Sequence, residues 1–281
     1  MTLEAPLAPG AARRRRLRSS TSLTRSSALG LGVALTWFSI LVLIPLALVV
    51  IQSTEGGWST FRDTLTSPQT ASALRLTVTQ ALYVTVLNVV MGTLIAWVLV
   101  RDSFPGKRLL EVVIDIPFAL PTIVAGLVLL SLYGPQGPLG INVANTGRSV
   151  FLALLFVTLP FVVRTVQPVL MELDRDVEEA AASLGASRFT TLRRIILPAL
   201  APAITAGAAL SFARGISEYG SLVLLSGNLP NKTEVASVRI LTYIENGNEA
   251  AAASVAVILL VVALLAITLL QVLSSVVARR G

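Results

Sequence analysis

The sequence of 281 residues contains no cysteine and no histidine. These absences exclude disulfide bonds, thiolate zinc sites and every nucleophile pair of the Ser-His or Cys-His type. The sequence also lacks the G-x-x-x-x-G-K-[ST] pattern, whose backbone cradles the phosphates of a nucleotide. We therefore expect a chain with no catalytic residues, no metal and no cofactor of its own.

Charged residues are scarce as well. They make up 13% of the chain, whereas 54% is hydrophobic and the mean hydropathy is +0.79. A soluble globular domain carries about 25% charged residues, so this chain has too little polar surface to cover a water-soluble body. The composition predicts a membrane protein of one domain. The net charge of +7 is attributed to loops at a membrane face rather than to nucleic-acid binding.

Long apolar runs dominate the sequence. A helix that crosses a bilayer needs about 20 largely apolar residues. Residues 1–27, which are rich in Pro, Ala, Arg and Ser, are instead predicted to form a disordered basic cytoplasmic tail. Six later segments are predicted to be transmembrane helices, at residues 28–51, 75–100, 112–133, 149–169, 200–225 and 252–277.

The distribution of Lys and Arg predicts the orientation of these helices. If the N-terminus is cytoplasmic, the inner segments carry fifteen of the 22 Lys and Arg residues and the outer segments carry five. The remaining two, Arg164 and Arg214, lie within predicted helices. Cytoplasmic loops are enriched in Lys and Arg. We therefore expect a multi-pass membrane protein with both termini in the cytoplasm.

The longest inner loop, residues 171–200, contains a short helix with well-defined ends. Asp174 or Asp176 can cap its N-terminus, and Gly185 is placed to end it. Its alanines favour helix and would allow another backbone to approach closely. Local physics alone leaves two interpretations open for residues 176–185: an amphipathic linker, or a helix that inserts into a partner protein.

A second helix is predicted over residues 188–196. It places Phe189, Leu192 and Ile196 on one stripe and arginines on the other, a pattern typical of a helix at a membrane surface. Pro198 is predicted to end it and to start the fifth transmembrane helix.

The loop as a whole resembles the EAA loop of ABC importer permeases. The resemblance rests on Glu179-Ala180-Ala181, on Gly185 four residues later, and on Ile195-Ile196-Leu197-Pro198. In that family the short helix is the coupling helix, which docks in a groove of the ATP-binding subunit. The resemblance covers about residues 72–277. It implies an all-α fold of six transmembrane helices with the type I importer architecture.

By the same resemblance, five residues are expected to dock the ATPase subunit, which would use the ATP. These are Glu179, Ala180, Ala181, Gly185 and Pro198. The expected partners are an ABC ATPase dimer, a second related permease and an extracytoplasmic binding protein, with the lipid bilayer around the permease.

Four further stretches resemble the T-type permease subunit of sulfate/thiosulfate importers, whose second permease is of the W type and whose binding protein takes sulfate. Molybdate permeases share the Glu-aromatic-Gly signal, so that piece alone does not decide the substrate. Tyr219 also stands where phenylalanine is more usual. The stretches are Asp115-Ile-Pro-Phe-Ala-Leu-Pro-Thr122, Glu218-Tyr-Gly-Ser221, Gly227-Asn-Leu-Pro-Asn-Lys-Thr-Glu234 and Leu270-Gln271.

Arg214 is the candidate for contact with an anion. A charge near the middle of a membrane helix costs about 2.5–3.5 kcal/mol on insertion scales, so it should face protein or water. Glu218 follows one turn later and can pair with it. Two interpretations fit: a structural ion pair, or a cationic point on the anion pathway. Full neutralisation of Arg214 by Glu218 would favour the first.

The other polar residues give weaker signals. Lys232 and Glu234 are candidate contacts for the binding protein, or members of a solvated loop. Arg164 is predicted to snorkel to the inner surface, and Asp115 to meet inner-loop arginines. Asn88 is expected to form hydrogen bonds between helices.

Prolines and rival functions complete the predictions. Pro117, Pro121 and Pro160 can kink their helices. A molybdate or tungstate permease is the nearest alternative function. An ion-coupled secondary transporter would need paired repeats and discontinuous half-helices in matching positions, which the sequence does not display. A membrane anchor without transport would leave the EAA-like loop unexplained.

Overall fold

The computed structural model describes residues 25–278, and every regular element in that range is helical, which confirms the predicted all-α class. Residues 1–24 of the predicted tail lie outside the described range. Two short stretches, Ser39–Leu43 and Leu192–Ile196, are π-helical. The α-helices are α1 (Arg25–Phe38), α2 (Ile44–Glu55), α3 (Gly57–Thr66), α4 (Pro68–Arg101), α5 (Lys107–Ala119), α6 (Thr122–Tyr133), α7 (Gly147–Glu172), α8 (Arg175–Ser183), α9 (Arg188–Thr191), α10 (Leu197–Ile216), α11 (Gly220–Leu225), α12 (Ala236–Glu245) and α13 (Glu249–Ala278).

The chain divides into two compact units, residues 1–47 and residues 48–281. In the first unit the described side chains are almost all exposed, including the large apolar ones. The helical run Ser27–Glu55 is long and apolar enough to cross a membrane, as predicted for residues 28–51.

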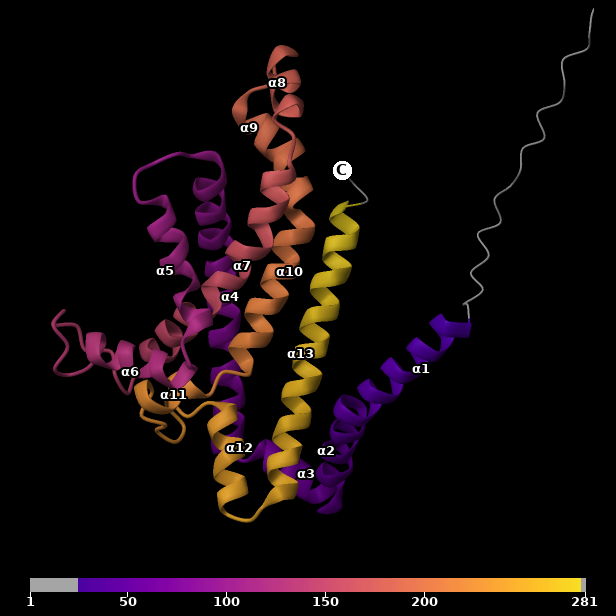
Figure 1. Cartoon of the computed structure of the whole chain (residues 1–281). Helices are drawn as coiled ribbons and strands as arrows, with labels where there is room; N and C mark the ends of the chain where they lie inside the picture. Colours follow the sequence, from indigo (N-terminus) through magenta and orange to yellow (C-terminus); the bar gives the residue numbers. More distant parts are fainter. Residues whose placement is uncertain (1–24, 279–281) are drawn as a thin grey trace, which may run out of the picture. The chain divides into compact units, whose positions relative to one another are not determined.

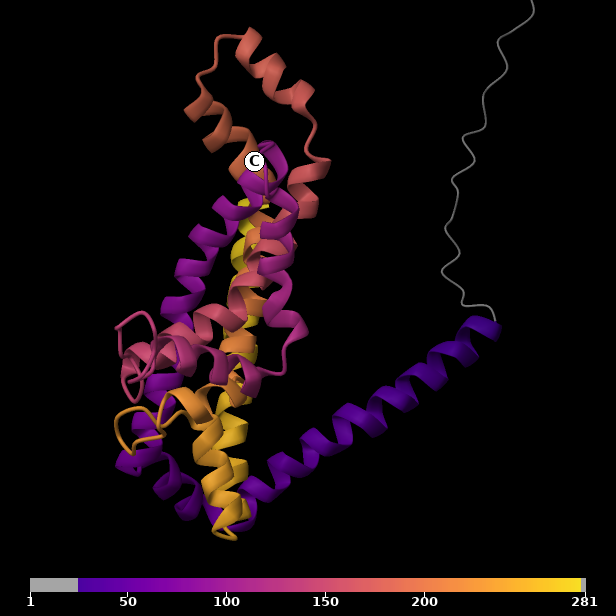
Figure 2. The ribbon, with the colours of Figure 1, turned by 60° about the vertical axis from the view of Figure 1, so that its left-hand side comes forward.

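The centre of the second unit is a bundle in which α4, α7 and α10 pack side by side, with α13 against α10 (Figure 1). Leu99, Val166 and Leu200, one from each of the three central helices, are fully buried in a shared apolar cluster. The helices of this bundle are long and apolar enough to span a bilayer. The α8 end of the bundle carries α8 and α9, and the α12 end carries α3 and the turn between α12 and α13 (Figures 1 and 2).

A polar contact joins the three central helices at mid-length. The Asn88 amide of α4 donates to Thr158 Oγ1 of α7 at 2.8 Å and to Ser211 Oγ of α10 at 3.1 Å. All three residues are buried. Hydrogen bonds between side chains of different helices fix the rotation of each helix about its own axis, because buried polar groups have no water with which to form hydrogen bonds instead. The expected interhelical role of Asn88 is confirmed.

Residues 112–133 do not form the single transmembrane helix that was predicted, so this prediction is wrong. The segment is divided into α5 and α6, whose axes differ by 118°. Leu120 between them has φ −87° and ψ 136°. It precedes Pro121, and the residue before a proline is disfavoured in the helical region. The kink expected at Pro121 is therefore a complete break, whereas Pro117 lies within α5 and Pro160 lies within an uninterrupted α7.

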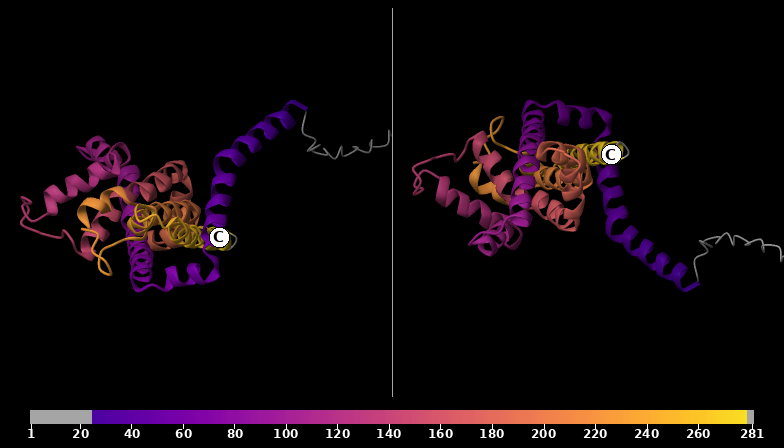
Figure 3. Two further views of the ribbon diagram at one scale, coloured as in Figure 1. Left: turned by 90° about the horizontal axis from the view of Figure 1, so that it is seen from below. Right: turned by 90° about the horizontal axis from the view of Figure 1, so that it is seen from above.

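The predicted fifth transmembrane helix, residues 200–225, is also interrupted. Here α10 ends at Ile216 and the short α11 begins at Gly220. The two half-helices α6 and α11 pack on one another and lie to one side of the bundle (Figures 1 and 3). At their contact a Cβ on Gly126 would lie 2.6 Å from the carbonyl oxygen of Ser221, so only glycine allows this approach.

Candidate functional site

The helix predicted over residues 176–185 is present as α8, Arg175–Ser183, which begins one residue earlier and ends two residues earlier than predicted. Of the two candidate caps, Asp174 has the role: its carboxylate accepts a hydrogen bond from the Asp176 amide at 3.0 Å. Asp176 and Glu178 place negative charge in the first turn, which the helix dipole favours. The helix is thus well formed by its own sequence although it carries no buried residue.

Gly185 ends α8 through a Schellman motif. Its φ of +81° is in the left-handed region that glycine adopts without strain. The Gly185 amide donates to the Ala182 carbonyl at 2.9 Å, and the Ala186 amide donates to the Ala181 carbonyl at 3.0 Å. These are the two hydrogen bonds that define this C-terminal cap. The exit of the chain from α8 therefore depends on a glycine at this position.

The face of α8 that is predicted to dock the ATPase subunit is largely exposed. Glu179, Ala180 and Gly185 are exposed and Ala181 is half-buried. Leu184, which was not predicted as a site residue, is 89% exposed. A large apolar side chain left this bare at the end of a helix is typical of a surface that a partner covers. In the sequence, Leu184 could have been recognised as a site residue by its apolar side chain and by its position directly before the capping glycine Gly185.

Pro198 lies apart from the other expected docking residues, in the first turn of α10. The helix that was predicted to stop there instead continues from α9 through the π-turn Leu192–Ile196 into α10, as one run from Arg188 to Ile216. Proline lacks an amide hydrogen and its ring clashes with the carbonyl four residues back. A π-turn is one of the local adjustments that absorb such a defect. Phe189 is exposed, so only Leu192 and Ile196 of the predicted stripe pack into the core.

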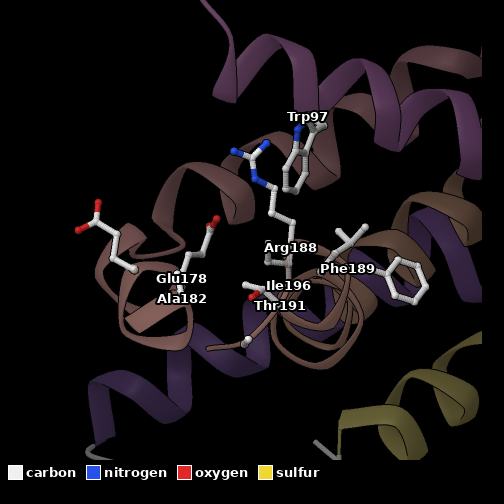
Figure 4. Close-up of a pocket in the computed structure, with 10 residues that line it drawn as sticks. Trp97, Glu178, Ala182, Arg188, Phe189, Thr191 and Ile196 are labelled. Carbon is white, nitrogen blue, oxygen red and sulfur yellow. The ribbon is translucent and has the colours of Figure 1, made fainter. Parts of the chain in front are cut away.

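A hollow of ≈ 570 Å³ lies between α8 and the segment of residues 186–196, with Trp97 of α4 in its lining. Figure 4 shows Glu178 on one side of it and Trp97 of α4 above. The lining is mostly apolar, with Arg188 and two glutamates at its rim. The α8–α9 segment therefore stands away from the bundle rather than packing flat on it (Figures 2 and 4).

An ion pair that the sequence did not predict joins α8 to the bundle. Arg101, the last residue of α4, donates to the carboxylate of Glu178. The Arg101 side chain is 11% exposed and that of Glu178 is 26% exposed. The two residues are far apart in the chain, so no local spacing could have indicated the pair.

Arg214 and Glu218 form the ion pair expected from their spacing, with 2.7 Å between nitrogen and oxygen. The Glu218 side chain is completely buried, whereas that of Arg214 is 30% exposed. The second Glu218 oxygen accepts hydrogen bonds from the amide and the hydroxyl of Ser221, both at 2.9 Å. Glu218 therefore bridges the break between α10 and α11, and Arg214 is neutralised beside it.

Arg164 does not snorkel, and Asp115 does not meet an inner-loop arginine; both expectations are corrected. Arg164 Nε donates to Asp115 Oδ1 at 2.8 Å, and another nitrogen donates to Gln167 Oε1 at 2.8 Å. The pair ties α5 to α7 just before the break after α5. An unpaired charge within the membrane is costly. Because Asp115 lies within reach, the Arg164 guanidinium is paired there and need not extend to the membrane surface.

The expected role of Glu234 in binding a partner is not compatible with its position. It is 5% exposed and accepts a hydrogen bond from Gln69 at 2.7 Å. Lys232 is exposed and stays a candidate contact.

Tyr243 of α12 shares a 2.8 Å hydrogen bond with Thr70 of α4. Burial raises the pKa of Tyr243, but hydrogen bonds to Thr70 and Arg239 outweigh it and leave the pKa below its ordinary value.

Within residues 25–278, no group of three or more Asp or Glu side chains is arranged to hold a metal ion. The candidate site is thus α8, an exposed helix at one end of the bundle, with paired charges inside the bundle and two broken helices between its ends.

Comparison with known proteins places this architecture among transporters. Residues 88–280 match the family model of the binding-protein-dependent transport system inner membrane component. The sulfate transport system permease protein CysT of Salmonella typhimurium is 40% identical over 269 residues, covering 93% of this chain and 97% of the relative. The protein of that name from Synechocystis is 40% identical, covering 86% and 87%. A probable sulfate transport system permease protein from Nephroselmis olivacea is 44% identical, covering 83% and 84%.

Solved structures agree on the fold. A chain of a bacterial alginate ABC transporter, in complex with an alginate-bound periplasmic protein, matches with a TM-score of 0.72 at 17% identity, covering 89% of this chain and 94% of its own. A chain of the MetNI methionine ABC transporter in an inward-facing conformation matches with a TM-score of 0.55 at 17% identity, covering 73% and 96%. At these identities the likeness concerns the fold.

Proposed function

The chain belongs to the family of binding-protein-dependent transport system inner membrane components, and from that membership we propose that it is the permease subunit of an ATP-driven importer of sulfate or thiosulfate. The observation that carries the proposal is identity of about 40% with sulfate permeases over more than nine-tenths of the chain. The permease lies in the inner membrane as a multi-pass protein and binds no nucleotide. A separate ATPase dimer supplies the energy.

The transport cycle is alternating access. The exposed side of α8, with Glu179, Ala180 and Gly185, docks on the ATPase subunit, and Ala181 supports this face from beneath. When ATP closes the ATPase dimer, the two α8 helices of the paired permeases are drawn together and the pathway opens to the outside. Sulfate shifts this equilibrium only through its different affinity for the two states. No covalent bond to the anion forms or breaks.

Two further partners complete the importer. A W-type permease pairs with this chain to form the pathway, and an extracytoplasmic binding protein delivers sulfate to its outer mouth, where Lys232 is exposed. Broken membrane helices are tolerated where the backbone lines a cavity or is buried in protein. The breaks around Leu120 and Glu218 therefore suit a helix pair beside a pathway. They also mean that broken helices do not by themselves distinguish this importer from a secondary transporter.

Arg214 and Glu218 stay candidates for the anion pathway, but their pairing favours the structural interpretation. A neutralised arginine offers an anion less attraction than a free one. Its exposed fraction, about a third of the side chain, is the observation that keeps the pathway role open.

The experiment that tests the function is uptake by the whole complex in proteoliposomes. We expect radiolabelled sulfate to enter only when ATP is enclosed on the ATPase side and the binding protein is added outside, and excess thiosulfate to compete. Molybdate in excess should compete weakly. Transport of molybdate with no transport of sulfate would replace this proposal by the molybdate alternative, and uptake driven by an ion gradient without ATP would refute both.

A further inference from the structure

The coupling helix α8 is attached to the bundle by two short covalent links. On its N-terminal side, Leu173 and Asp174 are both extended, with ψ of 115° and 125°. On its C-terminal side the chain turns through Gly185 and reaches α9 within a few residues. Little packing holds α8 along its length, because it has no buried residue and a hollow lies between it and α9. The covalent links hold α8 at its two ends, and a contact along its length is needed to fix its orientation on the bundle.

The Arg101–Glu178 ion pair is a third attachment. Within the part of the chain that the structure describes, it is the only side-chain hydrogen bond or ion pair between α8 and a membrane helix. The guanidinium also lies over the Trp97 ring, 5.7 Å from its centroid. Because both partners are largely shielded from water, salt and solvent weaken this pair less than an exposed one. It fixes the orientation of α8 relative to α4.

The helix that receives this attachment spans the whole bundle. The helix α4 is continuous over 34 residues and is therefore about 50 Å long. At the α12 end it is bound to the α11–α12 segment. Thr70 pairs with Tyr243 at 2.8 Å, Gln69 donates to Glu234 at 2.7 Å, and Thr77 Oγ1 accepts from the Ala236 amide at 2.9 Å. By contrast, α5 ends at the break before α6, and the helical run Arg188–Ile216 ends before α11 begins.

We propose that Arg101 is a positioning residue for energy coupling. Through Glu178 it transmits the displacement of α8 to α4, and α4 carries that displacement as a rigid body to the outer loops. The inference rests on the proposed function, because it takes α8 to be the helix that docks on the ATPase. Energy coupling of this kind is a free energy that links the ATPase-docking helix α8 to the outer loops, and it is measured as the effect of a variant on transport per ATP.

The test measures sulfate taken up per ATP hydrolysed by the assembled importer in proteoliposomes, with Arg101→Gln, Glu178→Gln and the charge swap Arg101→Glu/Glu178→Arg. We expect each single variant to retain the ATPase subunit on purification and to lose about tenfold in the uptake ratio, which lies within the range of about 5- to 150-fold for allosteric coupling. The swap should recover most of the ratio. Arg108→Gln, at an exposed position in the first turn of α5, removes the same charge and should leave the ratio unchanged.

Single variants with the wild-type ratio, or a swap that recovers nothing, would overturn the inference. If Arg101→Gln fails to assemble, Glu178→Gln carries the same expectation, because it keeps the shape of the side chain. The proposed function fails separately: it is refuted if the wild-type complex takes up no sulfate with ATP. Wild-type uptake together with unaffected single variants refutes the coupling role alone.

Discussion

At the scale of single residues, arginines within the bundle and at its end are paired with carboxylates. Arg101 at the end of α4 binds Glu178, and within the predicted membrane segments Arg164 binds Asp115 and Arg214 binds Glu218. A charge in the middle of a membrane helix costs about 2.5–3.5 kcal/mol on insertion scales, so Arg164 and Arg214 are each retained beside a carboxylate. Only the third pair, at i and i+4, could be read from sequence spacing.

The Arg214–Glu218 pair gives a prediction that separates its two interpretations. Arg214→Ala leaves the buried Glu218 carboxylate without its cation. It should lower the stability by about 2–3 kcal/mol, less than for a fully buried pair because Arg214 is partly exposed. The double variant Arg214→Ala/Glu218→Gln should recover both the thermal midpoint in detergent and sulfate uptake. Recovery of the midpoint without recovery of uptake would assign Arg214 to the anion pathway.

Gly185 gives a prediction about docking. A valine at φ +81° is strained by roughly 1–2 kcal/mol, which distorts the exit of the chain from α8. Gly185→Val should weaken co-purification of the ATPase subunit by about 5- to 30-fold, while the amount of permease in the membrane stays at the wild-type level.

Gly247 provides the matched control. It also has a positive φ, +70°, with open space around its Cβ position, but it lies in the turn between α12 and α13. Gly247→Val should leave ATPase co-purification intact. Equal loss in both variants would mean that general destabilisation, not docking, explains the effect.

At the scale of elements, the breaks in two membrane helices are the main departure from the predicted six uninterrupted helices. The high hydropathy continues across both breaks, since residues 112–133 and 200–225 are mostly apolar apart from a few charged side chains such as Asp115, Arg214 and Glu218. The broken pieces α6 and α11 are stabilised by each other, and the Leu129, Leu222 and Leu225 side chains join them to the apolar core with α7.

The contact between α6 and α11 is testable at Gly126. A Cβ there would meet the Ser221 backbone at 2.6–2.8 Å, so Gly126→Ala should destabilise the protein by about 1–3 kcal/mol through overpacking. Thermal unfolding in detergent measures this. Gly147→Ala, at the start of α7 with nothing within 4 Å of the added Cβ, should have a midpoint at or above the wild-type value. A neutral Gly126→Ala would contradict the close approach.

At the scale of the whole molecule, the charge bias predicts that the α8 end faces the cytoplasm. The chain has no cysteine, so single-cysteine variants report on one position at a time. Leu184→Cys at the α8 end and Lys232→Cys at the α12 end are both exposed positions. In intact cells a membrane-impermeant maleimide should label Lys232→Cys and leave Leu184→Cys unlabelled. The opposite pattern would reverse the orientation.

The sequence predicted the ends of α8 and the close pairing of Arg214 with Glu218, because capping and i,i+4 contacts depend on neighbours in the chain. It did not predict the burial of Glu234, which is held by Gln69 from α4. It also missed the partner of Asp115, which lies on α7. These contacts join residues from different helices, and one sequence contains no record of which helices become neighbours.

The sequence by itself determined the membrane class, the number of apolar segments and the position of the docking helix, because composition, hydropathy and local capping act within a short stretch of chain. Only the tertiary structure decided where the third and fifth segments break, which charges pair and how α8 is fastened to α4. Those features depend on backbones that approach across the bundle, as at Gly126, and on charges such as Arg101 that find a partner far along the chain.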